Sequence, residues 1–191
     1  VRGNDGVGVE LALDHLAGLG HSSIGYLKAV AHKRGEGRMD LCRASLARRG
    51  LGTRHIVEVD VPDFEGGKAG IDRMLARKSR PTAILTTNDI TAIGALQRAV
   101  ERGVDVPGEL SIVGYDDIPM AAMATVPLTT VSSPTNELAE LIVERLLARM
   151  GPGGGRRVEV VLEPTLVVRA STAPAMSDSR SRSPGKAKRR S

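Results

Sequence analysis

LSIVGYDDIPMAAMATVPLTTVSSP, residues 110–134, is the stretch of this sequence that decides the fold. It opens with an apolar run, Leu110 to Val113, which has the length of a buried strand and ends at Gly114. Asp116 and Asp117 follow at once. Because ligands of an open α/β sheet bind beside the carboxyl ends of its strands, we expect this acidic pair to border a binding cleft. Carboxylates there can accept hydrogen bonds from a polyol or an amine.

On both sides of this stretch, apolar runs of strand length alternate with helical patterns. The expected strands are 24–30, 55–61, 83–87 and 110–114, with further extended segments at 128–131 and 158–171; the expected helices are 8–19, 38–49, 65–78, 88–102 and 135–150. Alternation of this kind predicts an α/β fold with a mainly parallel sheet flanked by helices on both faces.

The composition is that of a soluble globular domain, with 41% hydrophobic and 26% charged residues in 191. The net charge of +5 lies entirely in residues 177–191, which carry six basic residues and one acidic residue. The rest of the chain is neutral, so the basicity does not indicate a DNA-binding face. We expect the polar, basic end of the chain to be disordered.

Signatures of an enzyme are missing from the sequence. Cys42 is the only cysteine, the four histidines form no metal-ligand pair, and no phosphate-binding loop or nucleophile elbow is present. Neighbouring residues such as Asp116 and Asp117 tend to point apart, which disfavours a catalytic carboxylate pair. We therefore predict no catalytic residue, no metal site and no cofactor. No apolar run is long enough to span a membrane and no secretory signal is visible, so we expect a cytoplasmic protein.

Three polar residues follow predicted strands and are the candidate ligand-binding residues: Arg38, Asn88 and Asp116. A guanidinium, an amide and a carboxylate together supply the donors and acceptors that bind vicinal hydroxyls. Each residue also has a structural interpretation. Arg38 can be a solvated surface charge, Asn88 a helix cap and Asp116 a turn residue. The binding hypothesis rests on their convergence at one edge of the sheet.

Several motifs resemble the effector-binding region of LacI/GalR-type transcriptional regulators. They are HLAGLGH (15–21), PTAILTTNDITAIGALQRAVERGVDVPGELSIVGYDDIP (81–119), PLTTV (127–131) and LVVRAST (166–172). The resemblance implies two periplasmic-binding-protein-like lobes with the effector between them. It matches Arg38, Asn88 and Asp116 to effector-contacting residues of the family. It also implies a homodimer that pairs partly through residues 93–97 and 120–125.

The resemblance also implies how the chain is divided. Residues 1–22 would be the remnant of an N-terminal lobe, 23–130 the C-terminal lobe, and 131–152 a crossing segment and helix of the N-terminal lobe. Residues 153–172 would be the final strands of the C-terminal lobe, and 173–191 a disordered basic tail. The expected fold is thus one lobe plus an incomplete second lobe. Three stretches depart from the family pattern. Near the cleft, Asn4-Asp5 stands in place of Asp-Asn; Leu41-Cys42 stands in place of a glycine–aromatic pair; and KAVAHKRGEG (28–37) lacks the Gly-Gly that follows the strand in the family.

The function that the resemblance implies is effector sensing and dimerisation in a DNA-binding regulator, here truncated, with a sugar or similar small polar molecule as effector. Operator DNA would be bound only through a helix-turn-helix that this chain lacks, and no membrane partner is expected. The alternatives are a sugar-binding protein of a transport system and a nonfunctional truncated remnant. An enzyme on a similar sheet is a further alternative, but it would need a nucleophile or metal set that the sequence does not show.

Overall fold

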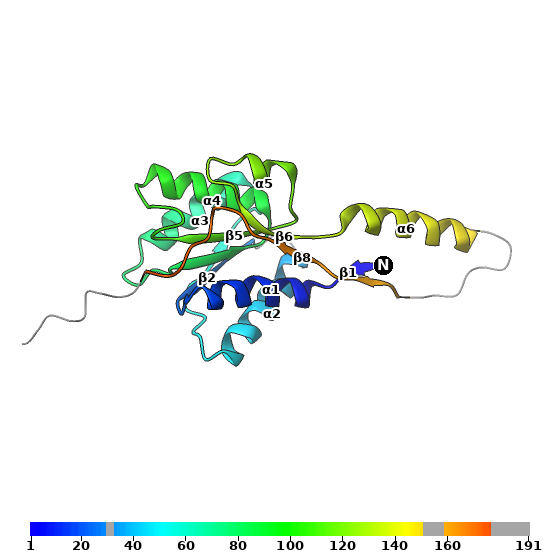
Figure 1. Ribbon diagram of the computed structural model, residues 1–191, viewed down its shortest axis with the longest axis horizontal. Helices are drawn as coiled ribbons and strands as arrows, with labels where there is room; N and C mark the ends of the chain where they lie inside the picture. Colours follow the sequence, from blue (N-terminus) through cyan, green and yellow to red (C-terminus); the bar gives the residue numbers. More distant parts are fainter. Residues whose placement is uncertain (30–32, 151–158, 177–191) are drawn as a thin grey trace, which may run out of the picture.

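The computed structural model describes residues 1–29, 33–150 and 159–176 and centres on one six-stranded sheet (Figure 1). The strand order is β3-β2-β4-β5-β6-β8; neighbours among the first five are parallel, and β8 is antiparallel to β6. The strands are β2 (Ile24–Ala29), β3 (Ile56–Val59), β4 (Ala83–Thr86), β5 (Ser111–Tyr115), β6 (Thr129–Ser132) and β8 (Thr165–Val167). This confirms the predicted α/β class with a mainly parallel sheet.

Helices cover both faces of the sheet (Figure 1). One face carries α1 (Asp5–Gly18) and α2 (Lys33–Arg48), and the other carries α3 (Phe64–Leu75), α4 (Asp89–Glu101) and α5 (Pro119–Met123). The order follows from βα alternation, because each parallel connection must return a helix across a face of the sheet. The second helix begins at Lys33 rather than near residue 38, since the basic, glycine-containing residues 33–37 are also helical.

Two apolar clusters form the core, one on each side of the sheet. Side chains of α1 and α2 pack with β2, β4 and β5 in the first cluster, and side chains of α3 and α4 pack on the other face in the second. The strands in the middle of the sheet are buried on both faces, which is why 83–86 and 111–115 read as continuous buried runs.

The structure corrects the assignment of the first helix. The sequence analysis placed residues 1–22 in a separate N-terminal lobe, but Val9, Leu13 and Leu16 of α1 are buried against the main sheet. This prediction was wrong for α1. An apolar stripe shows that a helix packs on a surface, but it does not show which surface.

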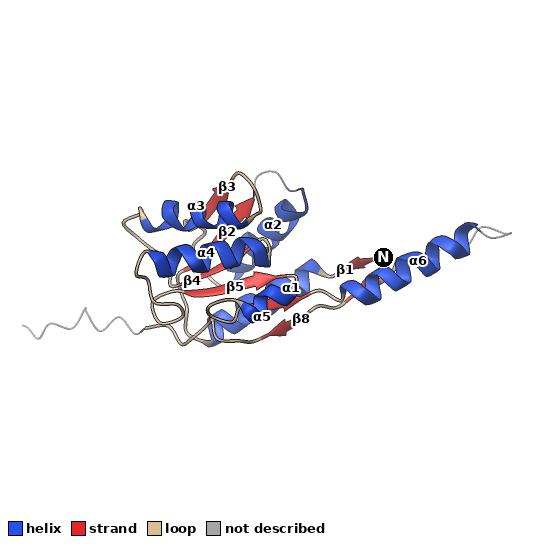
Figure 2. Ribbon diagram, turned by 90° about the horizontal axis from the view of Figure 1, so that it is seen from above, coloured by secondary structure: helices blue, strands red, loops and turns tan. Residues whose placement is uncertain are grey.

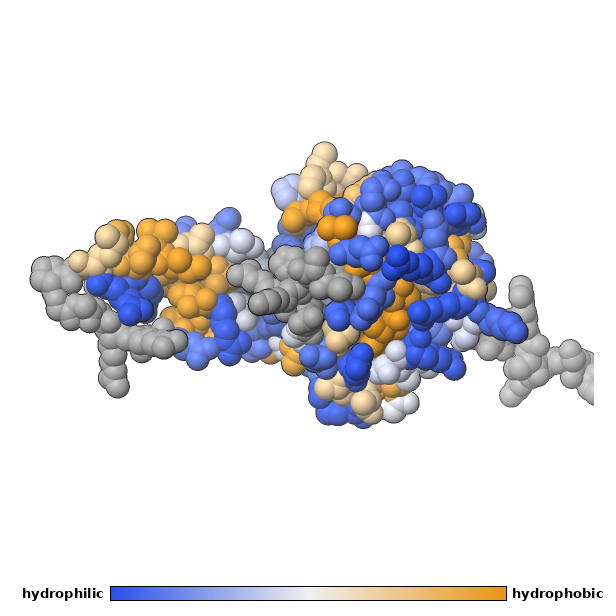
Figure 3. Space-filling view, turned by 180° about the vertical axis from the view of Figure 1, so that it is seen from behind, coloured by the Kyte–Doolittle hydropathy of each residue, from blue (hydrophilic) through white to orange (hydrophobic). Residues whose placement is uncertain are grey.

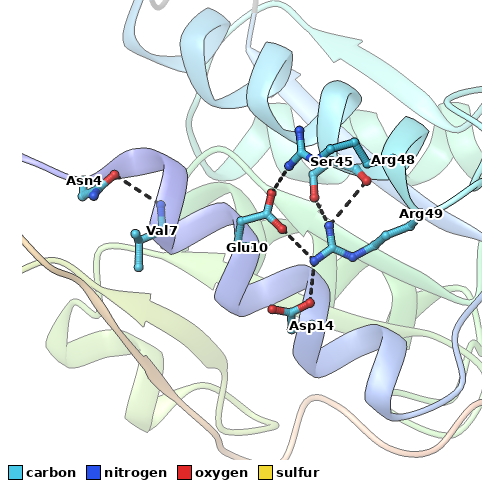
Figure 4. Close-up of polar contacts among 7 residues, drawn as sticks. All are labelled: Asn4, Val7, Glu10, Asp14, Ser45, Arg48 and Arg49. Carbon is cyan, nitrogen blue, oxygen red and sulfur yellow. Dashed lines mark hydrogen bonds and ion pairs between the residues drawn. The ribbon is translucent and has the colours of Figure 1, made fainter.

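A set of ion pairs joins α1 to α2 (Figure 4). Arg49 lies between Glu10 and Asp14 of α1, with its Nη2 2.6 Å from Glu10 Oε2, and it also donates to Ser45. Arg48 pairs with the other oxygen of Glu10. Charges on two neighbouring helices thereby fix how α1 lies against α2.

A smaller part of the chain extends beyond the sheet (Figure 2). It contains α6 (Thr135–Met150), which has no buried residue, and a two-stranded parallel sheet of β1 (Arg2–Gly3) and β7 (Val161–Leu162). Of the described strands after residue 152, only β8 therefore joins the main sheet, which corrects the placement of all of 153–172 there. The assignment of 131–152 to a second lobe stays a prediction.

Residues 173–175, which were assigned to the disordered tail, are held by hydrogen bonds. His21 Nε2 lies 3.0 Å from the carbonyl oxygen of Ala173, and the amide of Ala175 donates to Leu19 O at 2.8 Å. These bonds hold the segment at the amino-terminal edge of the sheet. Residues 177–191, where the rest of the tail was predicted, lie outside the described residues.

Candidate functional site

Arg38 is held beside the carboxyl ends of two central strands. Its Nη1 donates to the carbonyl oxygen of Thr87, just beyond β4, at 2.7 Å. Its guanidinium carbon lies 3.9 Å from the ring centroid of Tyr115 at the end of β5, within the range of a cation–π contact. The side chain is only 13% exposed, so Arg38 is not the solvated surface charge that the structural interpretation offered.

Asp5 completes this cluster, and the sequence analysis did not identify it as a site residue. Its Oδ1 lies 3.2 Å from Arg38 Nε and accepts a hydrogen bond from Tyr115 Oη at 3.1 Å. Burial, and after it the negative charge of Asp5, raises the pKa of Tyr115, so the hydroxyl keeps its proton and donates. Asp5 therefore balances the charge of Arg38. Gly8 makes room for this contact, because a Cβ there would lie 2.3 Å from Tyr115 Oη.

Asn88 caps the helix that follows β4. Its Oδ1 accepts from the amide of Thr91 at 2.9 Å, and its Nδ2 donates to Pro62 O at 3.0 Å. The helix-cap interpretation therefore holds for Oδ1, and Nδ2 is also engaged within the protein. The amide keeps one N–H and one lone pair beyond these bonds, so contact with a ligand stays a prediction.

Asp116 lies in a tight turn after β5 and borders an open depression. Asp116 has φ 108° and Asp117 has φ 53°, and residues other than glycine seldom adopt this region of backbone conformation. The depression is lined by Asp116, Asp117, Pro119, Ser132, Ser133, Pro134, Thr135, Asn136 and Glu137. Of the three predicted ligand-binding residues, Asp116 alone is part of this lining. Asn88 follows β4, and Arg38 lies on α2 with its guanidinium beside the end of β4.

A second carboxylate that the sequence analysis did not single out for binding lies beneath this turn. Asp89, in the first turn of α4, is 0% exposed. Its Oδ2 accepts from the amide of Ile118 at 2.9 Å and its Oδ1 from Thr130 Oγ1 at 2.6 Å. Burial raises the pKa of Asp89 to about 6. The side chain that caps α4 is that of Asn88, and Asp89 is the first residue of the helix.

Arg169 supports the turn from the other side. Its Nη2 lies 2.7 Å from Asp117 Oδ1, and its Nη1 donates to Leu128 O at 2.8 Å. Both side chains of this pair are largely buried. The carboxylate of Asp117 is therefore engaged within the protein, although Asp117 borders the depression together with Asp116.

The described residues contain no group of three or more His, Cys, Asp or Glu side chains that could hold a metal ion. None of the helices in the described ranges is long and apolar enough to cross a membrane.

Comparisons with known proteins show the family of this chain. The family model of the periplasmic binding protein-like domain matches residues 13–172. The ribose operon repressor of Haemophilus influenzae is 40% identical over 173 residues, covering 88% of this chain and 51% of the repressor. The regulator MalR of Streptomyces coelicolor is 34% identical over 183 residues, covering 90% of this chain and 51% of that protein.

Solved structures agree with these sequence matches. A LacI transcriptional regulator from a Rhodococcus species superposes with a TM-score of 0.84 and 36% identity, covering 92% of this chain and 65% of that one. The lac repressor dimer bound to operator gives a TM-score of 0.79 and 29% identity, covering 90% and 59%. The chain spans about half the length of the curated relatives it matches. It belongs to the family of periplasmic-binding-protein-like domains, in the effector-binding form that LacI/GalR-type transcriptional regulators carry.

Proposed function

We propose that this chain is the effector-sensing and dimerising region of a LacI/GalR-type transcriptional regulator, with a sugar or similar small polar molecule as effector. The observation that carries the proposal is the position of Arg38, held between Asp5, Tyr115 and the end of β4. This places a forked donor close to the strand that delivers Asp116 to the open depression.

The chemistry of the cluster favours a neutral, hydroxyl-rich ligand. Asp5 already balances the charge of Arg38, while Asp116 and Glu137 add acceptors at the depression. Hydroxyl groups can donate to these carboxylates and accept from the guanidinium. Two of the relatives are named for sugars or sugar operons: the ribose operon repressor of Haemophilus influenzae, and a sugar-binding LacI-family regulator from Escherichia coli, the latter at 27% identity. We therefore propose a pentose or hexose as effector.

The proposed action is a shift between conformations. An effector that binds one arrangement of the lobes more tightly changes the population of that arrangement and so the affinity for DNA. DNA contact is assigned to a helix-turn-helix outside residues 1–191, and no catalytic step is proposed. Such a regulator would work in the cytoplasm.

Dimerisation is proposed through the surface formed by residues 93–97 and 120–125. Met120 and Met123 of α5 are 50% and 81% exposed, so apolar side chains lie open on this surface. Exposed methionine and aliphatic groups are typical of surfaces that bury another protein. The lac repressor structure that this fold matches is itself a dimer.

Thermal unfolding of the chain tests the proposal. The panel would include D-ribose, D-glucose, maltose and purine nucleobases, each measured with the wild type and with Asp116→Ala. A matched control is Asp60→Ala, because Asp60 is an aspartate whose side chain is 84% exposed and forms an ion pair with the exposed Arg73. An effector at about 100 times its Kd stabilises by roughly 2.7 kcal/mol, which raises Tm by about 5–10 °C.

The expected result is a rise in Tm with one ligand that survives in Asp60→Ala and is lost in Asp116→Ala. If the ligand stabilises Asp116→Ala as strongly as the wild type, the proposed site is wrong. If a cooperatively folding chain responds to no sugar, a sugar effector is excluded for this chain.

A further inference from the structure

The turn that carries Asp116 needs support from its surroundings. Asp116 and Asp117 have φ values of 108° and 53°, and two successive non-glycine residues in this region are unfavourable unless other contacts hold them there. This turn joins β5 to α5 and sets the direction of the Asp116 side chain. Its anchors therefore determine the geometry of the candidate site.

Three contacts anchor the turn, one at each residue. The amide of Asp116 donates to Val131 O at 2.8 Å, and Asp117 pairs with Arg169 at 2.7 Å. The amide of Ile118 donates to Asp89 Oδ2 at 2.9 Å. The third anchor differs from the others, because its acceptor is a fully buried carboxylate on a separate helix.

Asp89 also reaches the other side of the depression. Its second oxygen accepts from Thr130 Oγ1 on β6, and β6 ends at Ser132, which lines the depression together with Ser133 and Pro134. One carboxylate thus connects the turn of Asp116 to the strand that leads into the opposite wall. Gly114 provides the space, since a Cβ there would lie 2.1 Å from Asp89 Oδ1.

Core packing alone does not account for a carboxylate at this position. The charged groups that act on Asp89 most strongly are Asp116 and Asp117, both acidic, while Arg169 is engaged by Asp117. A buried carboxylate without a cation is unfavourable compared with an apolar side chain, and this is consistent with its raised pKa. The contacts that Asp89 does make are directed at the turn and at β6.

We propose that Asp89 is a positioning residue that holds the turn of Asp116, and with it the Asp116 carboxylate, in the geometry that binds the effector. The inference rests on the proposed function, because it concerns the same site. Asp89 itself is buried and does not touch the ligand. It acts through the Ile118 amide and through Thr130.

Two variants of Asp89 and one control separate positioning from general stability. Asp89→Asn keeps an oxygen that can accept from the Ile118 amide, whereas Asp89→Ala removes it. Leu96→Ala is the control, because Leu96 lies on the same helix, is 1% exposed and belongs to the apolar core rather than to the turn. The probe is D-ribose, titrated into each protein by calorimetry below its unfolding temperature.

We expect Asp89→Ala to weaken D-ribose binding by about 10-fold or more, the effect of losing a hydrogen bond to a charged group. The Kd of Asp89→Asn should stay within about 3-fold of the wild-type Kd, because asparagine keeps an oxygen that accepts from the Ile118 amide. Leu96→Ala should lower Tm and leave the Kd unchanged. Wild-type affinity in Asp89→Ala, or an equal loss of affinity in Leu96→Ala, would overturn the inference.

A measurement without ligand keeps the inference separate from the identity of the effector. In ¹H–¹⁵N spectra, the Ile118 amide resonance of the wild type should move with a midpoint near pH 6 as Asp89 takes up its proton. Asp116 and Asp117 are also close to this amide, so the comparison is with Asp89→Asn, which keeps both of them and should lack this step. If the wild type fails to bind D-ribose, that result counts against the proposed ligand only. An Ile118 amide that titrates identically in both proteins counts against the role of Asp89.

Discussion

Gly114 and Asp89 occupy one small volume at the end of β5. A Cβ on residue 114 would lie 2.1 Å from Asp89 Oδ1 and 2.8 Å from Leu128 Cδ2, and both neighbours are buried. We expect Gly114→Ala to lower the free energy of unfolding by about 1–3 kcal/mol, because the buried neighbours must shift. Gly18→Ala is the matched control, since a Cβ there meets nothing within 4 Å. Chemical denaturation measures both variants; equal stabilities would show that the space beside Asp89 is not restricted.

The raised pKa of Asp89 predicts a pH dependence of stability. Its pKa is about 6 in the folded chain against an ordinary 3.8, so the folded state holds a proton that the unfolded state has released. The contribution of Asp89 to the free energy of unfolding is fully present below about pH 4 and is lost as the pH rises through 6. Relative to Asp89→Asn, the wild type should lose about 3 kcal/mol between pH 4 and pH 7, at about 1.36 kcal/mol per pKa unit. Urea unfolding of both proteins across this range checks the sign. Parallel curves would contradict the raised pKa.

At the residue scale, Arg38, Asn88 and Asp116 were selected because polar residues after parallel strands gather at one edge. Asn88 and Asp116 do follow β4 and β5, and the Arg38 side chain reaches from α2 to the end of β4, while their contact with a ligand stays a prediction. Asp5 was not identified, because its contact with Arg38 joins the start of α1 to a helix more than thirty residues later. Asp89 was not recognised as buried, because an acidic residue at the start of a helix is usually a solvated cap.

The contact between α1 and α2 combines apolar packing with charge. Arg49 is 21% exposed and contacts Glu10, Asp14 and Ser45, whereas Arg48 is 64% exposed and pairs with Glu10 (Figure 4). We expect Arg49→Met to lower the free energy of unfolding by about 1 kcal/mol. Arg48→Met should lower it by less than about 0.5 kcal/mol, because exposed ion pairs contribute little to stability. The cost of Arg49→Met should shrink in about 1 M salt, where exposed charges are screened. Denaturation at two salt concentrations measures this. Equal costs for the two arginines would contradict the argument.

At the scale of elements, the order of strands and helices followed from the sequence more readily than their placement did. Apolar periodicity and glycine or proline breaks marked the strands to within a few residues. The start of α2 was missed because Gly35 and Gly37 read as a loop, although the helix runs through both. The lobe of α1 was misassigned because its burial depends partly on packing with β5 and β6, which lie far along the chain.

The whole molecule consists of a well-packed sheet domain and an extension that shares little of its core. Figure 3 shows apolar surface gathered on the extension formed by α6. Its exposed apolar side chains are Ile142, Val143, Leu146, Leu147 and Met150, which are 49% to 75% exposed. Globular proteins seldom leave such a stripe uncovered. The two apolar clusters of the sheet domain, in contrast, contain no side chain of α6.

The contrast between the packed sheet domain and the exposed α6 leads to a prediction about stability. Leu13→Ala, at a site that is 0% exposed, should lower the free energy of unfolding by about 2–5 kcal/mol, because it leaves a cavity beneath the sheet. Leu146→Ala, at a site that is 58% exposed, should change it by less than about 0.5 kcal/mol. Urea unfolding at a low and a tenfold higher protein concentration measures both. If Leu146→Ala proves strongly destabilising only at the higher concentration, α6 is buried against a second copy in solution. If it is strongly destabilising at both, α6 packs within its own chain, and the independence of the sheet domain from α6 is wrong.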